Sequence, residues 1–172
     1  GADVVYSMKA AISNKFYCAV HLINVTSDDT ICSDNRLNSF CSAIDAAGLS
    51  EHFDEGFWTI FAPHDGAIYR SSDELFDLVQ GKSDDPELLA YHLLYHIAEN
   101  SMLKKEDLPC VAGNNLVSMS NGRETRTLCI GDNPTFQKGK GNPDDALPKI
   151  IEFDIEACNG VIHILDEVLL YG

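Results

Sequence analysis

Two short and almost fully apolar runs dominate the hydrophobic pattern of the chain. The first, Trp58–Phe61, favours a strand, and Pro63 should end it because proline has no N–H to donate to a strand ladder. Asp65 then has the side chain of a helix N-cap. The second run follows the turn signal Asn159-Gly160 and is too apolar to lie at an exposed sheet edge. We expect the two runs to form neighbouring strands.

Helical spacing of apolar residues predicts three helices around the first run. One begins at Leu37 and ends before Gly48, a residue type that commonly stops helices. A second follows the capping cluster Ser71–Glu74. The third, Leu88–Ala98, has Asp85 as its expected N-cap and is apolar nearly all round, so we expect it to be buried.

The second half of the chain has the pattern of strands. Asn121-Gly122 separates two short β-favouring segments and is a strong hairpin signal. Residues 131–147 are rich in Gly, Pro and Asp, which predicts a loop. Ile150–Ile155 predicts a further strand that leads into the second apolar run.

The composition indicates one acidic domain. A chain of 172 residues with 45% hydrophobic residues can form one sizeable core. With 12 Lys+Arg against 27 Asp+Glu, the formal net charge is -15, which repels phosphate backbones, so we expect no nucleic-acid partner. No apolar run reaches the length of a membrane span, so we expect no direct membrane insertion, with any leader or anchor outside this sequence.

Six cysteines without a C-x-x-C pair argue against a thioredoxin-like or common zinc motif and favour disulfides. Together with the sequon at Asn24, they indicate a secreted glycoprotein; a reduced cytosolic protein is the alternative. Sequence alone leaves the connectivity open. Our first expectation is Cys18–Cys32, which flank the sequon, Cys110–Cys129, which the hairpin brings together, and Cys41–Cys158, which remain.

Three motifs resemble the signature of the fasciclin domain family. They are T-I-F-A-P-x-D-x-A at residues 59–67, Tyr95-His96 among aliphatic residues, and N-G-V-I-H-I-L-D-E-V-L at residues 159–169. His64 stands where the family usually has Thr or a small residue. The resemblance implies an α+β fold, with two small, mainly antiparallel sheets that form a wedge and helices packed on one side. We expect residues 34–172 to form the fasciclin domain and residues 1–33 to form an extension packed on it.

The resemblance also implies a function, since fasciclin domains are extracellular adhesion and matrix modules that usually work without a cofactor. In animal members, adhesion is associated with an Asp-Ile pair just before the last motif and with the Tyr-His region. Here the expected site residues are therefore Asp154, Ile155, Tyr95 and His96. Their expected partner is a cell-surface or matrix protein or glycan, with neighbouring fasciclin repeats or self-association as further contacts. A purely structural role, with Ile155 in the core and Asp154 facing water, is the alternative.

Catalytic and metal-binding functions have weaker support in the sequence. His92 and His96 stand four apart on a predicted helix, a spacing that suits a metal, but a third ligand would have to be His163 or a distant carboxylate. Core histidines satisfied by hydrogen bonds are the simpler interpretation. His163 and Asp166 should lie on opposite faces of a strand, and no G-x-S-x-G elbow occurs. We therefore expect no enzyme, no metal and no cofactor, and keep a metal-dependent hydrolase as the least favoured alternative.

A secreted carbohydrate- or lipid-binding protein is the remaining alternative. It would need Trp58 to be exposed, whereas a buried Trp58 favours adhesion through surface loops. We further expect His96 to be neutral and buried, and Tyr95 to point the other way, towards solvent or a helix.

Overall fold

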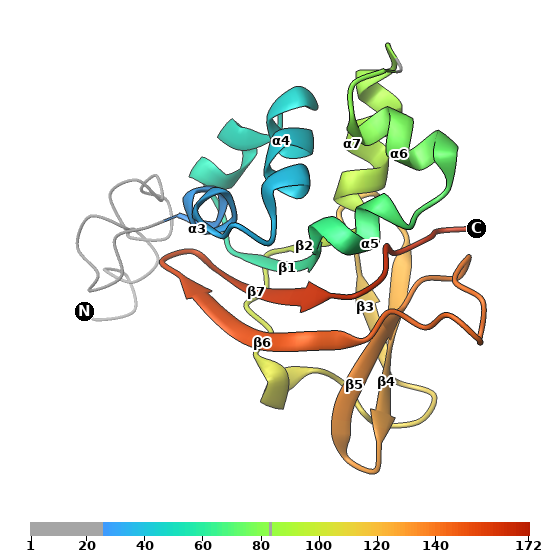
Figure 1. The fold of residues 1–172 in the computed structure, drawn as a ribbon. Helices are drawn as coiled ribbons and strands as arrows, with labels where there is room; N and C mark the ends of the chain where they lie inside the picture. Colours follow the sequence, from blue (N-terminus) through green and yellow to red (C-terminus); the bar gives the residue numbers. More distant parts are fainter. Residues whose placement is uncertain (1–25, 83) are drawn as a thin grey trace, which may run out of the picture.

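The computed structural model describes residues 26–82 and 84–172 (Figure 1). Cys18 and Asn24, with the extension before residue 26, lie outside the described residues. The α-helices are α3 (Ser27–Ser33), α4 (Asn38–Ala46), α5 (Asp65–Tyr69), α6 (Asp73–Val79) and α7 (Pro86–Leu94), and short 3-10 helices span Ser50–Asp54 and Lys105–Asp107. The strands are β1 (Trp58–Pro63), β2 (Ile97–Glu99), β3 (Leu116–Ser118), β4 (Glu124–Ile130), β5 (Asn133–Lys138), β6 (Ile150–Ala157) and β7 (Gly160–Leu165).

The two apolar runs form the centre of a four-stranded sheet with the order β2-β1-β7-β6. Strands β1 and β7 are parallel, with Ile60 opposite Ile162, so the prediction that the two runs are neighbours is confirmed. The other strand pairs in both sheets are antiparallel, and β3-β4-β5 form the second sheet. The predicted fold class is therefore confirmed.

Both faces of the β1–β7 pair are buried, which explains why these strands are apolar along their whole length. One face, with Ile60 and Ile164, packs in a core cluster with helical residues such as Phe40. The helices gather on this side of the sheet (Figure 1). The other face, with Phe61 and Leu165, belongs to a second cluster that includes Val117 of β3. No helix in the described ranges is long and apolar enough to cross a membrane.

Two sequence predictions of secondary structure were wrong. Helix α7 ends at Leu94, and Ile97–Glu99 form β2, which pairs with β1 and uses the same apolar residues to complete the sheet. Only Leu89 and Leu93 of α7 are buried, because its other sides meet solvent or half-covered neighbours. The predicted loop 131–147 contains β5, whose Pro134 and polar residues conceal a strand that is held by its pairing with β4.

The capping prediction for Asp65 was also wrong. His64 is the N-cap of α5, since its Nδ1 accepts a hydrogen bond from the Ala67 N–H at 2.9 Å. The Asp65 carboxylate instead accepts the Ser39 N–H at 2.8 Å, at the start of α4. Helix α4 has no side-chain cap of its own at Leu37, so Asp65 supplies one from a distant part of the chain.

The disulfides agree with one of the three expected pairs. Cys110–Cys129 is present, at a Cα–Cα distance of 5.7 Å. The expected pairs Cys18–Cys32 and Cys41–Cys158 are wrong, because α3 packs beside α4 and brings Cys32 and Cys41 together, with 5.1 Å between their Cα atoms. Cys158 is also disulfide-bonded.

Candidate functional site

Asp154 lies at an irregularity in β6, where the pairing with β7 shifts register between Glu152 and Ile155. Its φ of 59° is in the left-handed region, which few non-glycine residues adopt and in which Asp is enriched. A bulge of this kind bends the strand and redirects a side chain. Residues held in this conformation inside a strand cluster at functional sites, so Asp154 is a candidate on geometry alone.

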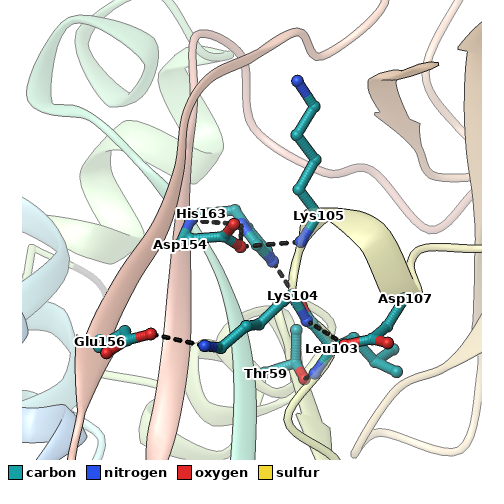
Figure 2. Close-up of polar contacts among 8 residues, drawn as sticks. All are labelled: Thr59, Leu103, Lys104, Lys105, Asp107, Asp154, Glu156 and His163. Carbon is teal, nitrogen blue, oxygen red and sulfur yellow. Dashed lines mark hydrogen bonds and ion pairs between the residues drawn. The ribbon is translucent and has the colours of Figure 1, made fainter.

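The neighbouring strand holds the bulge in place through His163. The Asp154 N–H donates to His163 Nδ1 at 3.2 Å, and His163 Nε2 donates to the Leu103 carbonyl at 2.7 Å (Figure 2). Both bonds are satisfied by a neutral imidazole with its proton on Nε2. Burial lowers the pKa of His163, which favours this neutral form, and the Leu103 bond and the Asp154 carboxylate oppose the shift only in part.

The Asp154 carboxylate is fixed by the next loop. Its Oδ1 accepts the Lys105 N–H at 2.8 Å and lies 3.9 Å from His163 Nδ1. Oδ2 forms no hydrogen bond within residues 26–82 and 84–172, and 37% of the side chain is exposed. The site therefore presents a positioned carboxylate with one oxygen open to an external donor or cation.

Residues 101–107 form a brace around this carboxylate (Figure 2). Thr59 Oγ1 in β1 accepts the Leu103 N–H at 2.9 Å, and it donates to the Ser101 carbonyl at 3.0 Å. Lys104 Nζ bonds Glu156 Oε1 at 2.6 Å on β6. The loop is thus tied to β1, β6 and β7, which limits the movement of the Lys105 N–H and of the carboxylate it holds.

A cleft of about 560 Å³ adjoins Asp154. Lys105, Glu106, Asp132 and Asn133 are among its lining residues. Cys110 also lines it, so the Cys110–Cys129 disulfide stabilises one wall. The cleft has a volume suited to a few side chains of a partner.

Ile155 differs from its neighbour, because it is half-buried and packs against the larger core cluster. This is the location that strand alternation predicts for a structural residue. Asp154, by contrast, is exposed. In the expected Asp-Ile pair, only Asp154 has an exposed polar side chain that a partner could contact.

His96 is buried and fully bonded. Its Nδ1 lies 2.9 Å from the His92 carbonyl, and its Nε2 accepts the Leu169 N–H at 3.0 Å. Burial lowers its pKa to about 4, against which the His92 carbonyl acts weakly. The prediction of a buried histidine is confirmed, and the lowered pKa favours its neutral form.

Tyr95 does not point towards solvent, so that prediction was wrong. It is fully buried, and its hydroxyl donates to the Glu124 carbonyl at 2.9 Å and accepts the Lys140 N–H at 3.2 Å. Helix α7 ends just before Tyr95, and the Tyr95 ring packs in the second core cluster. Because a buried hydroxyl requires polar partners, it bonds these two backbone groups. Neither Tyr95 nor His96 shares a hydrogen bond with Asp154.

The histidine pair does not form a metal site. Both ring nitrogens of His96 are used internally, and His92 Nε2 lies 3.0 Å from the Tyr171 hydroxyl. In the described part of the chain, no three His, Cys, Asp or Glu residues are grouped as metal ligands. Asp166 accepts the Lys149 N–H while His163 points inward, so these two residues are not paired.

Trp58 is 4% exposed and donates from Nε1 to the Glu55 carbonyl. It offers no face for stacking on a sugar. This burial disfavours a carbohydrate or lipid site built on Trp58.

Several important residues were missed by sequence analysis. Lys104 and Lys105 carry no motif signal, because their role depends on a loop that meets three strands. Thr59 opens the first motif, but the motif does not reveal that its hydroxyl holds this loop. Asn159 did have a signal, but as a turn residue. In the structure its buried side chain accepts from Ser27 and donates to the Phe53 carbonyl at 2.7 Å, so it joins three segments.

The two-sheet fold and the two motif strands define a fasciclin-type module. A family model for the fasciclin domain matches residues 35–171. The chain therefore belongs to the fasciclin domain family.

Relatives of very different length share this domain. The chain is 32% identical over 138 residues to transforming growth factor-beta-induced protein ig-h3 of Sus scrofa and 28% identical over 138 residues to periostin of Homo sapiens. These matches cover 80% and 79% of this chain but 18% and 15% of those proteins, so the chain spans less than a fifth of either. A third match, to the protein sll1735 of Synechocystis, has 27% identity and covers 81% of this chain and 93% of that protein.

A solved structure shares the fold. It is a FAS1 domain pair from the insect cell adhesion molecule fasciclin I, with a TM-score of 0.68 and 15% identity. The match covers 87% of this chain and 52% of that chain. At this identity, the similarity shows the fold alone.

Proposed function

We propose that this protein is a secreted or cell-surface adhesion module, without catalytic activity or cofactor, that binds a protein or glycan partner through the surface around Asp154. The observation that carries the proposal is the Asp154 carboxylate, held by the Lys105 N–H at 2.8 Å on a left-handed bulge with one oxygen open. An acid fixed in this way loses little conformational entropy when it accepts a donor from a partner. Membership of the fasciclin family supports the adhesive role.

The cysteines support an extracellular location. Cys32–Cys41 and Cys110–Cys129 are disulfides, and such bonds persist in oxidising compartments. Glycosylation of Asn24 would agree with the same route and stays a prediction.

The four expected site residues have different roles in this proposal. Asp154 contacts the partner, and Ile155 holds the strand against the core. Tyr95 and His96 act from inside, since they link α7 to the hairpin and to the C-terminal segment. Substitution of either buried residue should harm attachment through stability.

The domain organisation is part of the proposal. We propose that residues 34–172 form the fasciclin domain and that residues 1–33 pack on it as an extension. Two contacts of α3 support this: Ser27 bonds Asn159 at 2.9 Å, and Cys32 is bridged to Cys41. Neighbouring repeats or self-association would then raise avidity, because linked modules rebind at high effective concentration.

The test is a cell- and matrix-attachment assay on immobilised folded protein. Asp154→Gly removes the carboxylate and suits the left-handed backbone, and Asp154→Asn keeps the shape without the charge. Asp145→Asn removes an exposed carboxylate elsewhere and serves as the matched control. We expect both Asp154 variants to lose attachment and the control to keep it.

Two results would contradict the proposal. Attachment that both Asp154 variants retain would mean that the site lies elsewhere. Turnover in a hydrolase screen, combined with no attachment by folded wild type, would exclude the adhesive function.

A further inference from the structure

A second cleft, of about 750 Å³, lies over the outer face of the β3-β4-β5 sheet. Its charged lining residues are Arg123, Arg126, Lys138 and Lys140, with Glu124 and Asp144. The cleft therefore has an excess of positive groups in a chain whose formal net charge is -15. It shares no lining residue with the cleft beside Asp154.

The strand register places two of the cations side by side. Arg126 of β4 is paired with Lys138 of β5, so both side chains project from the same face of the sheet. Directly opposite residues have Cβ atoms about 5 Å apart, and like charges in this position destabilise a sheet. The opposite face carries Thr125, Thr127 and Gln137, which are buried and bonded to one another. Arg126 and Lys138 thus share a rigid platform on which Asp144 pairs with only one of the two charges.

The cations at this cleft are mostly not neutralised by the protein. In the part of the chain that the structure describes, Arg123, Arg126 and Lys140 form no ion pair with a carboxylate. Arg126 donates to the neutral Asn115 side chain at 2.8 Å. Acidic groups outnumber basic ones more than two to one, so a shortage of carboxylates does not explain this.

Aromatic residues hold the Arg123 side chain and the backbone of the cleft in position. Arg123 donates to the Tyr91 hydroxyl at 2.7 Å, and its guanidinium lies 5.3 Å from the centre of the Tyr171 ring. The buried Tyr95 hydroxyl bonds the backbone of both Glu124 and Lys140, which fixes the two walls of the cleft relative to each other. Little reorganisation is needed before a ligand binds.

We propose that this cleft binds an anionic oligosaccharide that carries sulfate or uronate groups. Arg123, in the turn just before β4, and Arg126 of β4 both line the cleft, and a separation of three residues spans roughly 10 Å at the rise of a strand. A line of fixed cations matches a ligand with repeated charges rather than a single ion. Guanidinium groups form paired hydrogen bonds with planar or tetrahedral oxyanions, and the exposed Ser118 at the same cleft offers a hydroxyl that matches those of a sugar.

Other polyanions fit the site less well. An anionic membrane presents a flat surface, whereas this site is concave. Base stacking would need a free aromatic face, whereas Tyr171 packs against Tyr91, Tyr95 and Arg123. An extended acidic peptide would gain most from the backbone of a sheet edge, and this cleft is lined by the side chains of a face.

Asp144 already neutralises one cation of the cleft, because its carboxylate pairs with Lys138. This contact lowers the pKa of Asp144 and keeps one of the four cations occupied. A bound oligosaccharide would compete with Asp144 for Lys138.

The experiment is a calorimetric titration of the folded protein with a sulfated, uronate-bearing octasaccharide, with neutral dextran as the negative probe. Measurements at about 0.01 M and about 0.15 M ionic strength use the change in Debye length from about 30 to about 8 Å. We expect binding that weakens with salt. The double variant Arg126→Gln/Lys140→Gln should bind about tenfold or more weakly, because it removes two charged donors.

Two further variants sharpen the test. Asp144→Asn frees Lys138 and should bind several-fold more tightly than wild type. Lys82→Gln removes one cation that is paired with Asp77 away from the cleft, and it should bind as wild type does. Melting temperatures of all variants should stay near that of the wild type, since the substituted side chains are exposed or half-buried.

Each contrary result is distinguishable from a failure at Asp154. Absence of binding at low ionic strength, or equal losses in Lys82→Gln and in the double variant, would overturn the proposal. Tighter binding of poly-glutamate or of a single-stranded oligonucleotide would overturn the assignment to a saccharide. Asp154→Gly should leave the titration unchanged, whatever the attachment assay shows.

Discussion

His96 and His163 belong to two of the sequence motifs, yet they serve two different regions. His96 joins α7 to the C-terminal segment, and both of its partners are backbone groups inside the protein. His163 is equally buried, but one of its partners is the N–H of the exposed Asp154. The contacts of His96 stay inside the protein, whereas His163 connects strand β7 to the exposed Asp154 and limits its movement. The comparison shows that a buried histidine can serve the fold alone or position a surface group.

The largest expected effect concerns the disulfides of the two regions. Cys32–Cys41 closes nine residues on the helical side, and Cys110–Cys129 closes 19 residues beside the Asp154 cleft. Replacement of either pair by serine should lower the free energy of unfolding by about 2 to 4 kcal/mol, with the longer loop at the upper end. Chemical denaturation of both variants measures this order.

The connectivity itself is checked on the same protein. Thiol labelling of denatured, unreduced wild type should find no free SH, and peptide mapping should recover Cys32–Cys41. Labelled thiols at most positions, with a melting temperature that ignores reductant, would contradict an oxidised extracellular protein.

Acid should act on both regions. Burial places the pKa of His96 at about 4 in the folded protein, below the ordinary 6.5, and lowers that of His163 in the same direction. Between pH 4 and pH 6.5 these histidines therefore bind more protons in the unfolded chain than in the folded protein. Their contribution to the free energy of unfolding is complete above pH 6.5 and is lost as the pH drops towards 4. His96 alone should account for up to about 3 kcal/mol of this loss.

The measurement is urea denaturation at a series of pH values. His96→Gln, which has no group that titrates in this range, should flatten the curve between pH 6.5 and 4. An unchanged pH dependence in this variant would show that His96 is protonated at little cost in the folded state.

Removal of the His96 side chain should leave the buried Leu169 N–H without an acceptor. His96→Ala should therefore lose about 1 to 3 kcal/mol of stability, measured by thermal denaturation. Attachment and oligosaccharide binding per folded molecule should not change. Loss of a bound metal at an unchanged melting temperature would instead support a metal site at His92 and His96.

The smallest effect on stability is expected at Asp154. Asp154→Gly loses the bond to Lys105 but relieves the backbone conformation at φ 59°, so the two changes should offset each other to within about 0.5 kcal/mol. This contrast with His96→Ala separates the two regions: one variant unfolds the protein more easily, and the other removes function. A destabilisation of Asp154→Gly as large as that of His96→Ala would assign Asp154 to the fold.

Much of the fold could be predicted because local sequence patterns favoured the same helix ends, caps and turns that the tertiary structure contains. Gly48 ends α4 with φ 69°, Ser72 caps α6, and Asn121-Gly122 forms the expected hairpin turn. The error at Ile97–Glu99 has a tertiary cause. This segment is apolar enough for either a helix or a strand, and it forms a strand because it can pair with the edge of β1.

The candidate site was predictable in part. A family motif pointed to Asp154, and the structure places it on the surface with a fixed carboxylate. Tyr95 was assigned to solvent or a helix because sequence shows a hydroxyl but not its partners. The second cleft had no signal, since Arg126 and Lys138 become neighbours only through strand register.

The sequence by itself determined the two apolar strands, the helix boundaries marked by glycine and serine, and the family, because these depend on side chains close together in the chain. Tertiary structure alone decided that Asp65 caps α4, that Cys32 meets Cys41, and that His163 supports Asp154. Each of these contacts needs a precise approach of two segments. Such an approach depends on how whole strands and helices pack, and no local pattern encodes it.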